Sequence, residues 1–170
     1  MDVSGEAVAT LRAGDISSLA DALASADPRA RLLAAVDDIA AARLQVTIFS
    51  ASICLPEVME LQRIYSSRPD VYPLGMRKNK QGTSWAEQVL RRRKVFVGEG
   101  PLEMAAAFDD QQRMASVGIR SIINVPIVVG DRCLGVLNFA RAVERVSSAE
   151  IVVARFLGVA ASAAFVDAAG

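Results

Sequence analysis

The chain has 170 residues, of which 52% are hydrophobic and 22% charged, and its 19 basic and 19 acidic residues give a formal net charge of zero. This length and composition predict one domain with a substantial core, excluding wholesale disorder and a strongly basic nucleic-acid-binding protein. The longest apolar run near the C-terminus, residues 156–166, is too short to cross a bilayer. Because the N-terminus also has no secretory pattern, we expect a cytoplasmic protein.

The absence of histidine removes several kinds of chemistry at once. Ser-His-Asp and Cys-His catalysis, histidine metal sites and histidine-ligated haem all need an imidazole. The two cysteines, Cys54 and Cys133, lie far apart within separate strand-like runs. We expect them to be isolated, buried and reduced, without a disulfide. The sequence therefore predicts no catalytic residue, no bound metal and no cofactor.

The N-terminal part of the chain is Ala-rich and has a helical pattern. Residues 1–26 predict a helical extension, in which Asp15 or Ser17 caps a short helix. Asp27 followed by Pro28 is typical of an N-cap and a first helical turn, and predicts a second helix over residues 28–43. The pattern then changes to a β-rich run that begins near Val46 and ends at Pro56.

The middle of the chain alternates between strand, loop and helix signals. Residues 58–65 predict a second strand, and the Pro- and Gly-containing residues 71–82 predict a loop. The capping-box pattern S-W-A-E predicts a short helix over residues 84–93. A brief third strand over residues 95–97 and a helix over residues 109–117 follow.

Two β-rich runs near the C-terminus, residues 122–129 and 133–139, flank the turn-forming pair Gly130-Asp131 and predict an antiparallel hairpin. Pro126 cannot donate a ladder hydrogen bond, so we expect a bulge or an edge in the first run.

The register of this hairpin decides where its two asparagines point. With a two-residue turn, Asn124 lies opposite Leu137 and Ile123 lies opposite Asn138. Because side chains alternate between faces with period two, we expect Asn124 and Asn138 on opposite faces of the sheet.

The last helix begins with the capping-box pattern S-S-A-E at Ser147. One of its faces carries Val152, Phe156, Val159, Ala160 and Ala163. The whole order of elements predicts an α+β fold, with an antiparallel sheet of five to six strands and helices on both faces.

This order of elements resembles the GAF domain family from about Asp27 to Ala164, so we expect a GAF-like domain over residues 27–170. The resemblance includes the hairpin with its L-G-V-L-N strand, the T-S-W sequence that opens the middle helix, and residues 118–121. It implies a ligand cavity between one face of the sheet and the helices that join the middle strands. It also implies that the first and last helices pack together on the other face and often form a dimer.

The sequence departs from the GAF subfamilies whose ligands are defined. Asn79-Lys80 resembles part of the cyclic-nucleotide pattern, but Phe108 is followed directly by Asp109-Asp110 instead of lying three residues before an Asp-Glu pair. Bilin-binding members use a Cys next to a His, and this chain has no His. Free methionine sulfoxide reductases would need a thiol near residues 113–121, where none occurs.

Residues 77–94 carry seven basic residues and one acidic residue. They form either a solvated loop with cations at a helix C-terminus, or an anion-attracting rim at the mouth of the family's cavity. Trp85, the only tryptophan, is either a core aromatic or a wall of that cavity. We predict the following ligand-binding residues: Lys78, Trp85, Phe108, Met114, Arg120, Ser121 and Asn138.

We therefore expect a stand-alone, non-catalytic sensory module that binds a small anionic molecule and contacts neither a membrane nor nucleic acid. The Ala-rich helices at residues 28–43 and 148–166 allow close packing and predict a homodimer that transmits the signal. One alternative is a structural dimerisation module without a ligand. Another is a small enzyme such as a free methionine sulfoxide reductase, which the placement of the cysteines disfavours.

Overall fold

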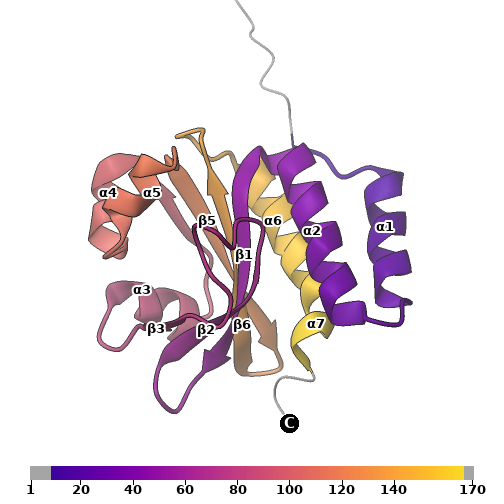
Figure 1. Ribbon diagram of the computed structural model, residues 1–170, viewed down its shortest axis with the longest axis horizontal. Coiled ribbons are helices and arrows are strands. Elements are labelled where there is room, and N and C mark those ends of the chain that lie inside the picture. The colour runs from indigo at the N-terminus through magenta and orange to yellow at the C-terminus, as the bar shows by residue number, and fades with distance from the viewer. Residues whose placement is uncertain (1–8, 167–170) are drawn as a thin grey trace, which may run out of the picture.

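A computed structural model describes residues 9–166, in which a six-stranded antiparallel sheet separates two layers of helices (Figure 1). The strands follow the order β3-β2-β1-β6-β5-β4 across the sheet. Their bounds are β1 (Val46–Leu55), β2 (Glu60–Ser66), β3 (Arg77–Asn79), β4 (Phe96–Glu99), β5 (Ser121–Val129) and β6 (Arg132–Arg141). This arrangement confirms the predicted α+β fold class, with an antiparallel sheet and helices on both of its faces.

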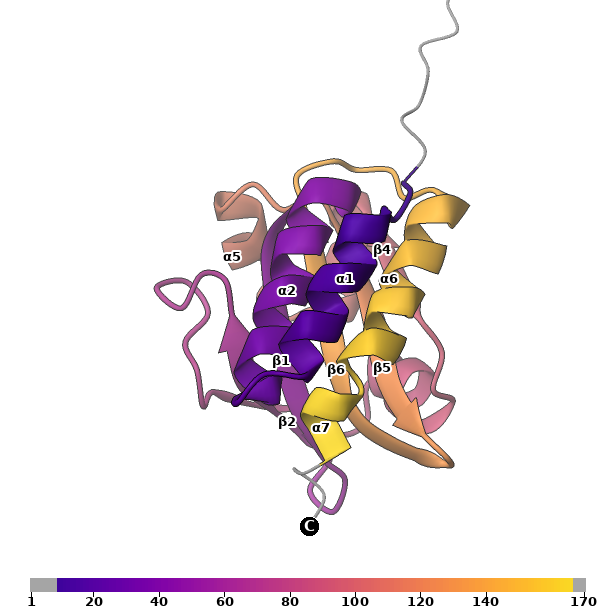
Figure 2. The same cartoon turned by 90° about the vertical axis from the view of Figure 1, so that its right-hand side faces the viewer.

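Different helices cover the two faces of the sheet (Figure 1). One face is covered by α2 (Pro28–Leu44), α6 (Ser148–Ala161) and α7 (Ala163–Val166), and α1 (Ala13–Leu23) packs on the outside of α2 (Figure 2). The other face is covered by α3 (Ser84–Ala86) with its π-helical continuation η1 (Glu87–Arg91), α4 (Gly100–Ala107) and α5 (Gln111–Ser116). Among residues 9–166, no helix has the length and apolar character that a membrane span requires.

The capping patterns fix the starts of the two long helices. The Asp27 carboxylate accepts a hydrogen bond from the Ala30 amide, and Ser147 and Glu150 form a reciprocal capping box at α6. The predicted cap of α1 is wrong, because Arg12 is the N-cap and Asp15 lies in the first turn. In α3 the cap is Thr83, whose hydroxyl accepts from the Ala86 amide.

Two elements were missed by the sequence analysis. Helix α4 begins at Gly100-Pro101, between the predicted strand over residues 95–97 and the predicted helix over residues 109–117. A proline in the first helical turn is compatible with the helix, because the amide hydrogen that it lacks has no intrahelical acceptor there. Strand β3 lies within the predicted loop and has three residues, too few to show an alternating pattern.

Helix α6 is apolar on two faces. Its inward face is buried against the sheet and α2 and consists of Val153, Ala154, Leu157, Gly158 and Ala161. The predicted apolar face points outward instead, and Val152, Phe156 and Val159 are 64%, 40% and 71% exposed. The described part of the chain therefore leaves an apolar stripe on α6 in contact with solvent.

The guanidinium group of Arg141, at the end of β6, joins three elements. It donates to the carbonyl oxygen of Leu44 at the end of α2 (2.7 Å) and to the carbonyl oxygen of Arg145 (2.9 Å). Its third contact is an ion pair with Glu150, in the first turn of α6. Only 1% of the Arg141 side chain is exposed, so its charge depends on these partners.

One-residue bulges shift the strand register on both sides of β1. Between β5 and β6, Ile127 pairs with Gly135 and Val128 pairs with Cys133, so that Leu134 is an extra residue in β6. Between β1 and β2, Ala51 pairs with Tyr65 and Ser52 pairs with Arg63, so that Ile64 is an extra residue in β2.

The bulge at Leu134 overturns the predicted hairpin register. Asn124 pairs with Asn138, and both side chains point to the same face of the sheet. The expected opposite orientation is wrong, because it assumed an uninterrupted ladder from the turn. The bulge lies in β6 and not at Pro126, while Pro126 lies beyond the part of β5 that pairs with β4.

We predict that Glu150→Ala lowers the free energy of unfolding by about 3–5 kcal/mol, because it leaves the buried Arg141 cation without its carboxylate. Urea titration measures this loss. Asp70→Ala is the control, since Asp70 pairs with Arg68 on the exposed surface and its removal should have no measurable effect. Equal stabilities of the two variants would contradict the proposed role of Arg141.

Candidate functional site

A cavity of about 80 Å³ lies between the sheet and the helices α3 and α5. Its floor is formed by inward-facing residues of the strands, among them Ile48, Ser50, Leu61, Arg63 and Asn138. Residues of the β3 region, α3 and the segment around α5 form the remaining walls. This volume accommodates several water molecules or one compact organic group.

A chain of hydrogen bonds fixes one wall of the cavity to its floor. The indole nitrogen of Trp85 donates to Asn124 Oδ1 (2.9 Å), and Asn124 Nδ2 donates to Asn138 Oδ1 (2.7 Å). Asn138 Nδ2 in turn donates to Ser50 Oγ (3.2 Å). An unpaired buried amide costs about 1–3 kcal/mol, so these paired amides fix the ring of Trp85 and, with it, the start of α3.

Lys80 places a buried cation at the aromatic wall. Its ammonium nitrogen lies 4.9 Å from the ring centroid of Trp85 and 5.5 Å from that of Phe108. These distances are within the range of cation–π attraction. Burial, together with the positive charge of Lys78, lowers the pKa of Lys80 below its usual range. The residue is therefore a desolvated cation that an anion in the cavity would stabilise.

Three further polar groups in the cavity wall have no hydrogen-bond partner within the protein. They are Arg63 Nε, the Tyr72 hydroxyl and Asp110 Oδ1, and all three atoms are buried. Burial lowers the pKa of Arg63 and raises that of Tyr72 to about 12. The other oxygen of Asp110 accepts from Lys78 Nζ at 2.7 Å. The cavity thus offers two hydrogen-bond donors, the guanidinium group of Arg63 and the hydroxyl of Tyr72, and one acceptor, Asp110 Oδ1, to a molecule inside it.

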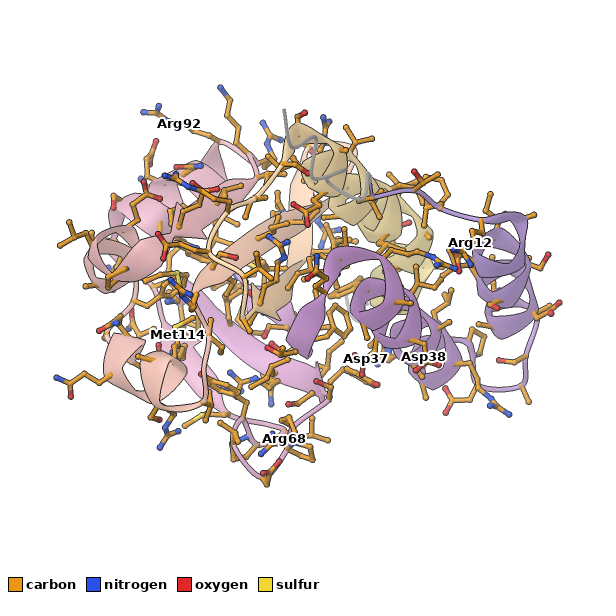
Figure 3. All side chains as sticks on the ribbon, turned by 90° about the horizontal axis from the view of Figure 1, so that it is seen from above. Arg12, Asp37, Asp38, Arg68, Arg92 and Met114 are labelled. Carbon is orange, nitrogen blue, oxygen red and sulfur yellow. The ribbon has the colours of Figure 1, made fainter. Side chains whose placement is uncertain are left out.

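The structure brings five of the seven predicted ligand-binding residues to this cavity: Lys78, Trp85, Phe108, Met114 and Asn138. Figure 3 shows Met114 on this side of the sheet, with Asp37 and Asp38 of α2 on the opposite side.

The other two predicted residues lie elsewhere. The exposed guanidinium group of Arg120 pairs with Glu144 (2.6 Å), and the buried Ser121 hydroxyl donates to the Val143 carbonyl oxygen. Ser121 also lies one residue out of phase with Ile122, which lines the cavity. Sequence proximity to the hairpin suggested these two residues, but strand alternation turns Ser121 to the other face.

The basic side chains of the segment 77–94 lie partly at the cavity and partly on the surface. Only Lys78 and Lys80 of its basic residues line the cavity. Arg91 and Arg92 pair with Glu87 on the surface, as the helix-end interpretation expects, and Arg93 donates to the Asp131 carbonyl oxygen. The charge near the cavity is therefore smaller than the count along the sequence suggests.

Sequence reasoning missed four of the polar wall residues: Arg63, Tyr72, Lys80 and Asp110. Lys80 was noticed in an incomplete motif and among the basic residues of segment 77–94, but not as a ligand-binding residue, although a lysine near a lone tryptophan is a signal for a cation–π contact. Arg63 shares its face of β2 with Leu61 by ordinary strand alternation, but nothing in the sequence indicated that this face lines the cavity.

Metal binding finds no support among residues 9–166, where no three Cys, Asp or Glu side chains gather as a metal ion would require. The two cysteines do not line the cavity. The expectation that they are isolated from each other is wrong, since they lie on the neighbouring strands β1 and β6 and line one groove.

Solved structures with the same fold include domains of several kinds. The GAF domain of a phosphoenolpyruvate-protein phosphotransferase from Coxiella burnetii has a TM-score of 0.75 and 15% identity, covering 92% of this chain and 93% of that chain. The free methionine-R-sulfoxide reductase of Neisseria meningitidis, in complex with its substrate, has a TM-score of 0.63 and 14% identity, covering 89% and 85%. The phycoerythrobilin-bound GAF domain of a cyanobacterial phytochrome has a TM-score of 0.62 and 18% identity, covering 94% and 99%.

At these identities the structural likeness shows the fold alone. No curated protein matches the sequence. The family model of the GAF domain matches residues 27–165, which begin at the capped start of α2 and end within α7. Since this match covers most of the sequence and agrees with the fold, the chain belongs to the GAF domain family.

Proposed function

We propose that this GAF domain is a non-catalytic sensory module that binds one small anion-bearing molecule in the cavity between the sheet and helices α3 and α5. The observation that carries the proposal is the coincidence of unpaired polar atoms. Within residues 9–166, all three buried side-chain atoms without a protein partner, on Arg63, Tyr72 and Asp110, line this one cavity. Structural polar groups are normally paired, so their convergence favours a ligand as the missing partner.

The chemistry of the walls defines the class of ligand. Arg63 and Lys80 favour a carboxylate or phosphate group, and Tyr72 supplies a hydroxyl that stays protonated at neutral pH. Asp110 Oδ1 favours an N–H or O–H donor elsewhere on the same molecule. Trp85 and Phe108 supply apolar surface beside the Lys80 cation. A compact anion that also carries a donor satisfies all of these groups.

The two alternatives receive less support. A structural module without a ligand should fill the cavity with its own side chains, whereas about 80 Å³ stays open here. A free methionine sulfoxide reductase needs a reactive thiol at the cavity, and none of the lining residues is a cysteine. We therefore prefer ligand sensing without catalysis.

The first prediction concerns the ligand itself. In a thermal-shift screen of small carboxylates, phosphates, amines and uncharged compounds, we expect the hits to be anions. Lys80→Met should weaken their binding by about 10- to 100-fold, because a hydrogen bond to a charged group contributes about 1.5–3 kcal/mol. Lys94→Met is the matched control, since Lys94 is exposed and does not line the cavity.

Native mass spectrometry of the freshly purified protein identifies any molecule that copurifies. Hits that are mainly cationic or uncharged, or equal affinities of the Lys80→Met and wild-type proteins for anions, would refute the proposed ligand class.

The second prediction is a pH dependence of anion binding. The lowered pKa of Lys80 means that its charge is lost at a lower pH than that of an ordinary lysine, about 10.4. Affinity should fall as the pH rises from 7 through this lowered pKa. Lys80→Arg should keep its affinity over the same range, because a guanidinium group stays protonated. Titration calorimetry measures both curves, and parallel curves would rule out Lys80 as the titrating group.

The third prediction concerns assembly, which we propose to be a homodimer formed through the outer face of α6. Two alanines of the expected helix contact, Ala161 and Ala164, are buried in the core, and α1 covers part of α2. The exposed stripe Val152, Phe156 and Val159 has the i, i+4, i+7 spacing of a helix–helix contact.

Sedimentation equilibrium should show a dimer at concentrations on the order of tens of micromolar. Phe156→Glu should yield a monomer, because it places a charge in the centre of an apolar contact. Val58→Glu, on an exposed turn away from α6, should remain dimeric. A monomeric wild-type protein would exclude this assembly.

A further inference from the structure

Cys54 and Cys133 lie 79 positions apart in the sequence, yet the fold places them next to each other, on neighbouring strands and in the wall of one groove. Cys54 lies near the end of β1, and Cys133 lies at the start of β6, its neighbour in the sheet. Both side chains are partly buried and pack against one apolar cluster, which includes Leu61, Trp85 and Leu90. Two adjacent thiols on neighbouring strands meet the first requirement for a disulfide.

The bulge at Leu134 creates this contact. Cys133 pairs with Val128, whose side chain lies in phase with Pro126 and Asn124 on the cavity side of the sheet. Without the extra residue, strand alternation would place Cys133 on the opposite side, in phase with Gly135. Cys54 lies in phase with Ser50 and Ser52, which face the cavity side. The irregularity thus puts both sulfur atoms on one face.

The two thiols differ in acidity and are accessible. The neighbouring Cys133 thiol lowers the pKa of Cys54, while the contact with Cys54 and burial raise the pKa of Cys133, whose S–H donates to the Gly135 carbonyl oxygen. Cys54 is therefore the thiol that ionises first and attacks an oxidant. Both residues line a groove whose other walls include the exposed side chains of Val58 and Arg132. A small oxidant reaches them from this side, away from the ligand cavity.

We propose that Cys54 and Cys133 are a redox-modification site, at which a hydroperoxide converts the dithiol to a reversible intramolecular disulfide. The Cys54 thiolate attacks one peroxide oxygen and the O–O bond breaks, so that Cys54 becomes a sulfenic acid, while the other oxygen takes up the proton released by the thiol and leaves as water from hydrogen peroxide or as an alcohol from an organic hydroperoxide. Cys133 then attacks the Cys54 sulfur, and the sulfenic oxygen leaves as water. With hydrogen peroxide, two thiols and one peroxide give one disulfide and two waters. An external dithiol reverses the reaction by exchange.

The site also reports to the neighbouring cavity wall. Cys54 pairs with Leu61 of β2, and Leu61 pairs with Lys78 of β3. Leu61 and Lys78 both line the ligand cavity. A disulfide draws two sulfur atoms to about 2.05 Å, closer than any contact between unbonded thiols, and we expect the side chains and the ends of β1 and β6 to adjust to the bond. Trp85 belongs to the same cluster and is the only tryptophan, so its fluorescence reports the change independently of any ligand.

The experiment treats native wild-type protein with hydrogen peroxide and follows it by intact mass, peptide mapping without reductant, and Trp85 emission. We expect the mass to fall by two hydrogen atoms, a peptide pair joined through Cys54 and Cys133, and an emission change that dithiothreitol reverses. Cys133→Ser should accumulate a Cys54 sulfenic acid that dimedone captures, without the emission change. Cys54→Ser should leave Cys133 as an unreacted thiol.

The unfolded protein in urea provides the control for proximity. Native wild type should form the disulfide at least about tenfold faster than the unfolded chain, because the fold holds the two thiols together. Equal rates, or separate oxidation of each sulfur without the joined peptide, would overturn the proposal. If native protein forms no disulfide but still binds anions normally, the redox proposal fails and the proposed ligand site stands.

Discussion

The bulges on both sides of β1 are the constraint on which the cavity depends. Side chains in a strand alternate with period two, so one extra residue transfers every following side chain to the other face. In β2, the bulge at Ile64 leaves Arg63 on the cavity side while Tyr65 faces α2 and donates to Asp37. In β6, the bulge at Leu134 puts the cysteine pair on one face and leaves Asn138 beside Asn124. On regular strands Arg63 and Tyr65 would share one face, and Cys133 would lie on the face opposite to Cys54.

The cavity imposes a cost on folding that the rest of the core must offset. The pKa of Lys80 is lower in the folded protein than in the unfolded chain, chiefly because of burial. This difference lowers the free energy of unfolding wherever Lys80 is protonated in the folded protein. The loss is absent above the ordinary lysine pKa of the unfolded chain, grows as the pH falls from there, and is complete below the lowered pKa of the folded protein. The unpaired atoms of Arg63, Tyr72 and Asp110 add to this cost. Contacts of Lys80 with Trp85 and Phe108 recover part of it. Under the proposed function, a bound anion would offset a further part of this cost.

The sequence predicted those features that depend on local patterns. The caps at Asp27 and Ser147, the hairpin and the order of the strands follow from residues close together in the chain, and they sufficed to recognise the GAF resemblance. Trp85 and Asn138 were correctly placed near each other in space because the resemblance located the cavity. The hairpin register, the contact between Cys54 and Cys133 and the opposite orientations of Arg63 and Tyr65 were not predictable in this way. They depend on bulges, which a single inserted residue creates without a distinct local signature.

Strand β6 connects the cavity to the helices on the opposite face. Successive side chains of β6 point to opposite faces of the sheet. Asn138 lies in the cavity floor, whereas Leu137 and Phe139 lie in the core beneath α2 and α6. At its end, Arg141 bonds to the last turn of α2 and to the first turn of α6. Under the proposed function, a displacement of β6 by a ligand would change contacts at both helices, and α6 carries the exposed stripe proposed as the dimer contact. Because a buried cation tolerates only a few well-paired arrangements, Arg141 would convert a small strand movement into a choice between distinct helix positions.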